Sequence, residues 1–257
     1  MYPINKALSL FNLRMSRISK PVAQISEREK RFLEKYDYYF KQIENNNRGF
    51  KAAKSYKYQV GEHPSKHVDV VCEFAAHCLY NAKPKPETIL DIGAWPQFII
   101  GMLSHYKVTS IDFRHRESRL KNETILTCDA KKLNIPDNSF DAVLGIGGFY
   151  TFGLGRYGDE IDLDADVKCF NEMVRVLKPG GMLIFLATIT KGDPYVFFNR
   201  CRIYNYEMIQ RFCEGLECIE ERYISRKMKN FCSMDQIVEP EPDCYDNYVG
   251  CWRKSKN

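Results

Sequence analysis

The chain has 257 residues, 44% of them hydrophobic, which is enough for one large domain or for one domain with an appendage. Its 38 Lys and Arg residues against 33 Asp and Glu give a formal net charge of only +5, which does not require a nucleic-acid partner and mildly favours an anionic substrate. The ten cysteines are scattered from Cys72 to Cys251 without a Cys-x-x-Cys pair, so the sequence indicates reduced thiols in a cytoplasmic protein rather than a zinc site.

Residues 1–60 are expected to form a helical N-terminal appendage or lid. No segment approaches the length of a membrane span, and the N-terminus lacks the continuous apolar core of a secretory signal. Residues 4–20 instead place apolar side chains at helical spacing among basic ones, and such a helix can make weak contact with an anionic membrane surface. A helix that packs on the domain or covers its active site is the favoured alternative. A second helix is expected from Ser26 to Gln42.

Residues 61–257 are expected to form one α/β domain. An amphipathic helix from Pro64 to Tyr80 leads through a proline-rich connector into alternating strands and helices, which implies a parallel sheet covered by helices. Two C-terminal strands should close this sheet as an antiparallel pair. The prediction is therefore a Rossmann-like three-layer sandwich with a mostly parallel, seven-stranded sheet. The expected strands are 88–92, 107–111, 124–127, 140–146, 182–189, 218–225 and 248–252, and the expected helices between them are 97–105, 163–177 and 205–214.

The most informative segment is the run from Glu87 to Gly93, an apolar strand that ends in Asp91, Ile92 and the glycine. A second apolar run ends in Asp112, nineteen residues after Gly93. A glycine at such a strand end lets the backbone approach a ligand, and an acid about twenty residues further on can bind ribose hydroxyls. The pair predicts a nucleoside site, in which the nucleoside can belong to a dinucleotide or to S-adenosylmethionine.

Five motifs narrow this choice. Together they resemble a class I S-adenosylmethionine-dependent methyltransferase over roughly residues 64–252, whereas a dinucleotide fold gives no reason for the third and fifth motifs. The motifs are Ile89-Leu90-Asp91-Ile92-Gly93, Ile111-Asp112, Cys128-Asp129-Ala130, Asn138-Ser139-Phe140-Asp141-Ala142-Val143 and Arg175-Val176-Leu177-Lys178-Pro179-Gly180-Gly181.

The resemblance implies a binding role for each matching residue. Asp112 would accept hydrogen bonds from both ribose hydroxyls. Asp129 would accept from the adenine amino group while the Ala130 N–H donates to a ring nitrogen. Gly145, at the end of the fourth strand, would allow close approach to the methyl donor. The full set expected around S-adenosylmethionine, or the product S-adenosylhomocysteine, is Asp91, Gly93, Ala94, Asp112, Phe113, Asp129, Ala130 and Gly145.

The first loop departs from the family pattern, because Trp95 stands where a second glycine is usual. Trp95 and Pro96 can crowd the methionine portion of the cofactor, or Trp95 can pack beneath it as a hydrophobic floor.

A second signature is Gly153-Leu154-Gly155-Arg156-Tyr157-Gly158-Asp159, with Asn199 and Arg202-Ile203-Tyr204 later in the chain. It resembles a little-characterised bacterial methyltransferase-like family that is linked with surface-polysaccharide (capsule or lipopolysaccharide) gene clusters. Loops after the fourth strand of such sheets face the ligand crevice. Arginine forks there can bind a phosphate or carboxylate of the acceptor. The expected substrate residues are Tyr150, Arg156, Asn199, Arg202 and Tyr204.

Candidate bases are less well defined. Asp159 or Tyr157 can orient or deprotonate an acceptor hydroxyl, and His63, before the first helix of the domain, is a reserve candidate. For Arg156 and Asp159 an equally good alternative is structural, with the arginine paired to local acids and the aspartate capping a helix. No metal is indicated.

The sequence therefore predicts methyl transfer from S-adenosylmethionine to a small phosphorylated, nucleotide-linked or sugar-containing metabolite, a precursor of bacterial surface polysaccharide. One alternative is a non-catalytic interaction or regulatory protein that uses the same fold, and another is an RNA methyltransferase. The RNA methyltransferase is disfavoured, since the basic residues are not gathered beside the site. The oligomeric state is not indicated by the sequence.

Overall fold

The computed structural model describes residues 27–45, 51–56, 66–118, 120–242 and 244–256. The chain forms two compact units, Met1–Pro64 and Ser65–Asn257. The segment 4–20 and the histidine at position 63 both lie outside the described residues, so the structure gives no account of the membrane-contact helix or of the reserve base. None of the helices in the described part of the chain is long and apolar enough to cross a membrane.

The described part of the first unit contains two helices, α2 (Glu27–Glu34) and α3 (Tyr36–Asn45), where the sequence predicts one from Ser26 to Gln42. The helix is interrupted at Lys35, whose N–H donates to the carbonyl of Phe32, three residues back, at 3.1 Å. This tighter turn breaks the regular four-residue ladder. No residue of either helix is buried, so packing does not enforce one continuous helix.

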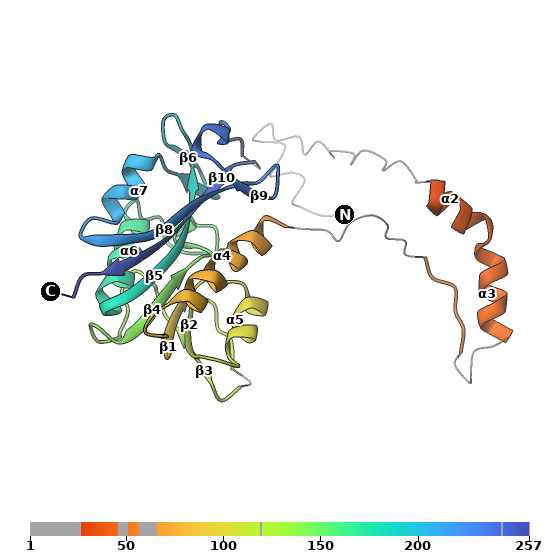
Figure 1. Ribbon diagram of the computed structural model, residues 1–257, viewed down its shortest axis with the longest axis horizontal. Coiled ribbons are helices and arrows are strands. Elements are labelled where there is room, and N and C mark those ends of the chain that lie inside the picture. Colours follow the sequence, from red (N-terminus) through yellow and green to blue (C-terminus); the bar gives the residue numbers. More distant parts are fainter. Residues whose placement is uncertain (1–26, 46–50, 57–65, 119, 243, 257) are drawn as a thin grey trace, which may run out of the picture. The chain divides into compact units, whose positions relative to one another are not determined.

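The second unit is built on one twisted sheet of eight strands in the order β3-β2-β1-β4-β5-β10-β8-β9 (Figure 1). The first five strands in this order are parallel to one another. Each of the last three pairs antiparallel with the strand before it in the order. The strands are β1 (Thr88–Ile92), β2 (Lys107–Asp112), β3 (Glu123–Thr127), β4 (Phe140–Gly145), β5 (Leu177–Ile189), β8 (Leu216–Ser225), β9 (Asn230–Cys232) and β10 (Asp246–Lys254).

The predicted Rossmann-like sandwich is confirmed, with one strand more than expected. The eighth strand, β9, has only three residues and adds to the edge of the sheet beside β8. A separate hairpin of β6 (Tyr195–Phe197) and β7 (Cys201–Ile203) follows β5. Such short strands carry no alternating apolar pattern long enough to be read from sequence.

Helices cover both faces of the sheet (Figure 1). On one face, α4 (His67–Asn81) and α5 (Pro96–Met102) share a buried cluster with Ile89 of β1. On the other face, α6 (Ala165–Val176) and α7 (Tyr206–Phe212) pack with its neighbour Leu90. Successive strand residues point to opposite faces, so the apolar runs of the parallel strands supply both layers.

The Lys-Pro-Gly-Gly element lies within β5, which begins at Leu177, five residues before the expected start of that strand at position 182. The pairing of β4 with β5 jumps from Phe140↔Leu177 to Ala142↔Met182, so the four residues form a bulge. Lys178 Nζ lies 2.7 Å from Asp141 Oδ1, and the other carboxylate oxygen accepts from the N–H groups that begin β1. Burial alone would raise the pKa of Asp141, but these bonds lower it to about 2. The motif therefore locks β1, β4 and β5 together.

Candidate functional site

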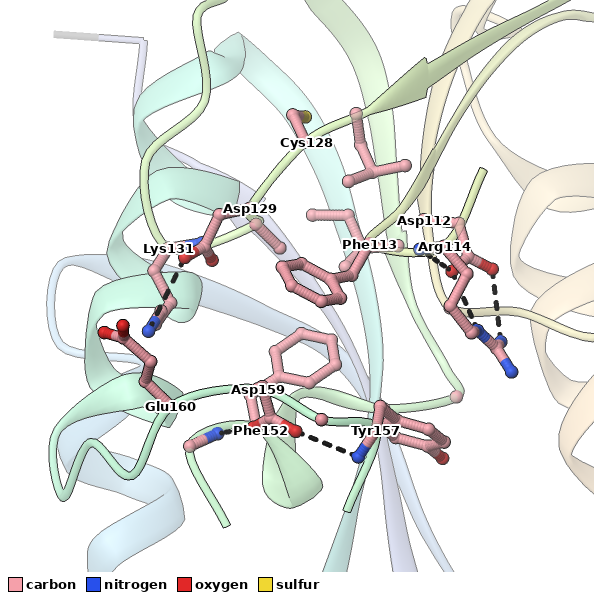
Figure 2. Close-up of a pocket in the computed structure, with 18 residues that line it drawn as sticks. Asp112, Phe113, Arg114, Cys128, Asp129, Lys131, Phe152, Tyr157, Asp159 and Glu160 are labelled. Atoms are coloured by element: carbon pink, nitrogen blue, oxygen red, sulfur yellow. Dashed lines mark hydrogen bonds and ion pairs between the residues drawn. The ribbon is translucent and has the colours of Figure 1, made fainter. Parts of the chain in front are cut away.

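A cavity of about 420 Å³ opens at the carboxyl ends of β1, β2, β3 and β4 (Figure 2). Six short segments line it, at or just after the ends of these strands and farther along the chain after β4. This is where parallel α/β sheets bind ligands. The lining comprises Ile92, Gly93, Ile111, Asp112, Phe113, Arg114, Cys128, Asp129, Ala130, Lys131, Gly147, Gly148, Phe152, Gly153, Tyr157, Gly158, Asp159 and Glu160.

Two glycine turns form one wall of the cavity. Gly93 has φ +77°, and a Cβ on Gly147 would lie 1.8 Å from the Gly93 carbonyl oxygen, so only glycine permits this approach. The sequence assigned Gly145 to the ligand. In the structure, a Cβ on Gly145 would instead lie 2.7 Å from the Met173 sulfur, inside the core. The Gly147-Gly148 pair after the apolar strand was the signal that sequence reasoning missed.

Trp95 is not among the residues that line the cavity. It precedes the first turn of α5, with Pro96 at the first helical position, and it packs partly buried against the α4–α5 core cluster. The Ala94 N–H donates to Asp91 Oδ1 at 3.0 Å, which closes the turn. Asp91 and Ala94 are not among the residues that line the cavity, and the hydrogen bond between them shapes the loop beside it.

Asp91 is buried, and this burial raises the pKa of its carboxyl to about 7, against opposing hydrogen bonds from Ala94 and Ser110. Between the ordinary value of 3.8 and about 7, the folded protein holds a proton that the unfolded chain has lost. The free energy of unfolding should therefore fall as pH rises through this window and level off above it. Asp91→Asn should remove the slope and stabilise the protein by about 2–4 kcal/mol at alkaline pH.

Urea unfolding between about pH 5 and pH 8 measures this difference. Asp193→Asn, at an exposed position, is the matched control and should leave the pH dependence of wild type unchanged. Parallel pH curves for Asp91→Asn and wild type would show that Asp91 is ionised throughout.

Asp112, the last residue of β2, is held by its neighbour Arg114. Its Oδ1 accepts the Arg114 N–H at 2.8 Å and Nε at 3.1 Å, while Oδ2 accepts Nη2 at 3.2 Å. The Arg114 guanidinium also lies over the Tyr157 ring, 5.2 Å from its centroid (Figure 2). The carboxylate expected to bind ribose is thus paired to a cation at the cavity edge.

Arg114→Gln should tighten the binding of S-adenosylhomocysteine, because a ribose diol must compete with this guanidinium for Asp112. We expect a gain of about two- to tenfold, the range of a partly exposed ion pair. Calorimetric titration measures the dissociation constant. Lys107→Gln, on the opposite end of β2 and exposed, is a charge-matched control. A weaker affinity in Arg114→Gln would mean that Arg114 is itself a ligand contact.

Asp129, two residues after β3, also lines the cavity with its side chain half exposed. Its Oδ1 accepts the Lys131 N–H at 2.9 Å, and Lys131 Nζ lies 3.5 Å from Oδ2 and 3.3 Å from Asp162 Oδ2. Figure 2 shows the rings of Phe113 and Phe152 pointing into the same space. This part of the cavity therefore offers aromatic faces beside a carboxylate.

Asp159 organises the loop after β4 and is poorly suited to act as a base. Its Oδ2 accepts the Gly153 N–H at 2.6 Å, and its Oδ1 accepts the Tyr157 N–H at 3.0 Å. Partial burial would raise the pKa of Asp159, but these backbone bonds lower it below its ordinary value. A carboxylate stabilised in this way has little tendency to accept a proton from an acceptor.

Arg202, expected from the sequence to bind substrate, has its guanidinium occupied by groups of the protein itself. It is buried, and its guanidinium donates to the carbonyls of Phe152 at 2.6 Å and Asp162 at 3.0 Å. Its Nε lies 3.5 Å from Asp166 Oδ1. The Arg202 guanidinium thus joins the chain that follows β4 to helix α6.

Tyr204 and Asn199, also expected to contact substrate, make hydrogen bonds within the protein. The Tyr204 hydroxyl is buried and donates to Asp166 Oδ2 at 2.7 Å. The Asn199 side-chain nitrogen donates to the Leu154 carbonyl at 3.3 Å. The late Asn…Arg-Ile-Tyr motif is therefore the support of the Gly-Leu-Gly-Arg-Tyr-Gly-Asp loop.

Tyr150 and Arg156 are not among the residues that line the cavity. Tyr150, in the short helix η1 (Phe149–Thr151), packs against all three core clusters, and burial raises the pKa of its hydroxyl. Arg156 is exposed and lies over the Tyr157 ring at 5.4 Å. Tyr157 itself lines the cavity and is the catalytic candidate that the structure leaves in position.

Comparison with known proteins agrees with this geometry. A family model described as a methyltransferase domain matches residues 90–185. Demethylmenaquinone methyltransferase of Thermotoga maritima is 29% identical over 172 residues, which cover 60% of this chain and 67% of that enzyme. The enzyme of the same name from Listeria welshimeri is 29% identical over 154 residues, covering 55% and 60%.

Among solved structures, 1,6-didemethyltoxoflavin-N1-methyltransferase of Burkholderia thailandensis, with S-adenosylhomocysteine bound, has a TM-score of 0.55. It is 14% identical, and the match covers 93% of each chain, which shows a shared fold. Fold, cavity and family model together define a methyltransferase. More particularly, the chain is an S-adenosylmethionine-dependent methyltransferase.

The residues of the cavity fit this cofactor. The Gly93–Gly147 approach leaves space that a Cβ would fill, and two carboxylates, Asp112 and Asp129, follow neighbouring strands with an aromatic face between them. When bound, the cofactor supplies a methyl group already activated by the adjacent sulfonium charge.

Proposed function

We propose that the protein methylates a small anionic or sugar-containing metabolite, a phosphorylated or nucleotide-linked precursor of bacterial surface polysaccharide. The observation that carries the cofactor half of this proposal is the convergence of Asp112, Asp129 and the Gly93–Gly147 contact on one cavity. The glycine-rich loop whose sequence resembles the polysaccharide-linked family lines the same cavity with Gly153, Tyr157, Gly158 and Asp159. The donor site and the motif that suggests the acceptor therefore meet.

In this proposal each cavity residue has a distinct task. Gly93 and Gly147 admit the methionine portion, and Asp112 accepts from the ribose hydroxyls in place of Arg114. Asp129 and the Ala130 N–H hold the adenine edge, between the rings of Phe113 and Phe152. The chain's contribution to catalysis is then mainly the alignment of donor and acceptor.

Tyr157 is the residue that we propose to orient the acceptor. Its ring lines the cavity, and the guanidinium groups of Arg114 and Arg156 lie 5.2 and 5.4 Å from its centroid. Cations held against an aromatic ring fix its position and favour negative charge beside it. Tyr157 can thus donate to, or accept from, a hydroxyl that enters from the loop side.

A second candidate acceptor is demethylmenaquinone, the substrate named in both curated relatives. Their alignments with this chain leave about a third or more of each enzyme unmatched, so the acceptor portion is not carried over by similarity. The two candidates differ in polarity, which makes them separable by a direct assay.

The test is formation of S-adenosylhomocysteine over nucleotide-linked sugars, phosphorylated metabolites and demethylmenaquinone, with Asp112→Ala as the blank. We expect turnover with an anionic sugar-containing acceptor and none in the blank. Turnover confined to demethylmenaquinone would replace the proposed acceptor, and equal signal in Asp112→Ala would refute the cofactor site.

We also propose that residues 61–257 form the catalytic domain and that residues 1–60 form an appendage or lid. Comparison of the full chain with a 61–257 truncation in the same assay tests this division. An appendage that covers the site should change the Michaelis constant of the acceptor while S-adenosylhomocysteine still binds to the truncated protein. No S-adenosylhomocysteine binding by a folded truncation would contradict the boundary.

A further inference from the structure

The Arg114 guanidinium contacts two walls of the cofactor cavity at once. Arg114 lies two residues after β2, and its side chain is paired with the Asp112 carboxylate. The same guanidinium lies over the ring of Tyr157, 5.2 Å from its centroid, and Tyr157 belongs to the loop after β4. All three residues line the cavity (Figure 2). Arg114 therefore lies between the proposed ribose site and the residue proposed to orient the acceptor.

The pair between Arg114 and Asp112 cannot persist unchanged when a ribose binds. A carboxylate offers about four lone-pair sites, and three donors of Arg114 already use those of Asp112. These donors are the backbone N–H at 2.8 Å, Nε at 3.1 Å and Nη2 at 3.2 Å. The two ribose hydroxyls need two sites. The backbone N–H is fixed by the chain, whereas the Arg114 side chain is 67% exposed and able to turn. The side chain is thus the partner that has to leave.

Lys131 shows a different arrangement at the second proposed cofactor carboxylate of the cavity. Its Nζ lies 3.5 Å from Asp129 Oδ2 and 3.3 Å from Asp162 Oδ2, so it keeps one carboxylate when adenine engages the other. Among the described residues, Asp112 is the only carboxylate that pairs with Arg114. The Arg114 guanidinium, unlike the Lys131 ammonium, therefore loses its counter-ion when the cofactor binds.

The two remaining acids that line the cavity are poorly placed to replace that counter-ion. Both carboxylate oxygens of Asp159 already accept backbone N–H groups of its own loop. Figure 2 shows Glu160 at the opposite side of the cavity from Arg114. The Tyr157 ring remains as a contact of the released guanidinium, and stacking on an aromatic face leaves the N–H groups at the guanidinium edge available to an oxyanion. An unbalanced positive charge at the cavity edge favours an anion there.

We infer that Arg114 binds a phosphate group of the acceptor once the ribose of the cofactor has displaced it from Asp112. The inference rests on the proposed function and adds an order of binding to it, cofactor before acceptor. The planar guanidinium fork that pairs with the two oxygens of Asp112 is equally suited to two oxygens of a phosphate. Before the cofactor binds, Asp112 competes with the acceptor for Arg114, and afterwards it does not. Arg114 is thus a specificity-determining residue.

The experiment is calorimetric titration of the full-length protein with inorganic phosphate, with and without saturating S-adenosylhomocysteine, at constant ionic strength. In wild type, S-adenosylhomocysteine should tighten phosphate binding by about fivefold or more, as two coupled sites commonly do. Reciprocity requires phosphate to tighten S-adenosylhomocysteine binding by the same factor, which checks the coupling from the other side. Arg114→Gln should bind phosphate weakly under both conditions. Lys107→Gln, exposed at the opposite end of β2, is the matched control and should keep the coupling.

Asp112→Asn separates the role of Arg114 from that of the cofactor. This variant releases the guanidinium without any ligand, so it should bind phosphate in the absence of S-adenosylhomocysteine as tightly as the wild-type complex does. Phosphate binding that S-adenosylhomocysteine leaves unchanged in wild type, or coupling that persists in Arg114→Gln, overturns the inference and leaves the cofactor site standing. Since Arg114→Gln is expected to bind S-adenosylhomocysteine, that titration also shows that the variant is folded. Absence of S-adenosylhomocysteine binding in wild type would refute the proposed function itself, and the order of binding with it.

Discussion

Asp112→Asn is expected to weaken the binding of S-adenosylhomocysteine by about thirtyfold or more, since charge-assisted hydrogen bonds contribute about 1.5–3 kcal/mol each. Asparagine keeps the size of the side chain but offers one acceptor oxygen in place of two. It also releases Arg114 from a pair in which both carboxylate oxygens accept from the guanidinium. The ribose would therefore meet a neutral amide beside an uncompensated cation. Calorimetric titration measures the loss directly.

The matched control for Asp112→Asn is Glu117→Gln, which removes one negative charge from an exposed position in the following loop. It should bind S-adenosylhomocysteine as wild type does. Thermal unfolding should separate binding from folding, because the Asp112–Arg114 pair is partly exposed and such pairs contribute little to stability. Wild-type affinity in a folded Asp112→Asn variant would rule out the ribose contact.

The sheet and the position of the cofactor cavity could be predicted because both depend on local signals. Apolar runs such as that from Thr88 to Ile92 bury both faces of a strand, and the structure begins and ends β1 at the expected residues. A strand-end glycine with positive φ is similarly a property of a few neighbouring residues, as Gly93 shows. The carboxyl ends of parallel strands then share one edge of the sheet, so Asp112 and Asp129 had to lie near each other.

The acceptor side could not be predicted, because its contacts join residues that are far apart in sequence. Arg200 and Arg202 are separated by a single residue, yet one lies over Tyr245 and the other is buried beneath the glycine-rich loop. Residue type cannot distinguish them, because Arg200 lies in the turn before β7 and Arg202 lies within it, and so short a strand leaves no pattern in the sequence that shows where it begins. Residue type does not distinguish two nearby glycines either. A Cβ on Gly145 would meet Met173 in the core, whereas a Cβ on Gly147 would meet Gly93 at the cavity.

Arg202→Gln should lower the free energy of unfolding by about 3–5 kcal/mol, the cost of breaking a buried ion pair from one side. The guanidinium is buried and donates to three carbonyls, those of Phe152, Asp162 and Leu163. Asp166, itself buried, would lose its cation and keep only the hydrogen bond from Tyr204. Arg202→Lys should recover little of this loss, because an ammonium cannot reproduce the planar fork that spans several carbonyls. Urea unfolding measures the change for both variants.

Arg222→Gln again serves as the control for Arg202→Gln, and it should lower the free energy of unfolding by no more than about 1 kcal/mol, as for other exposed pairs. The expected consequence for function follows from where the released carbonyls lie. Phe152 and the adjacent Gly153 line the cofactor cavity, so loosening them should weaken S-adenosylhomocysteine binding in Arg202→Gln even at temperatures where the protein is folded. If Arg202 instead contacted the acceptor, Arg202→Gln would keep both stability and S-adenosylhomocysteine affinity and lose only turnover. The two measurements together therefore decide whether the Arg-Ile-Tyr motif supports the loop or binds the acceptor.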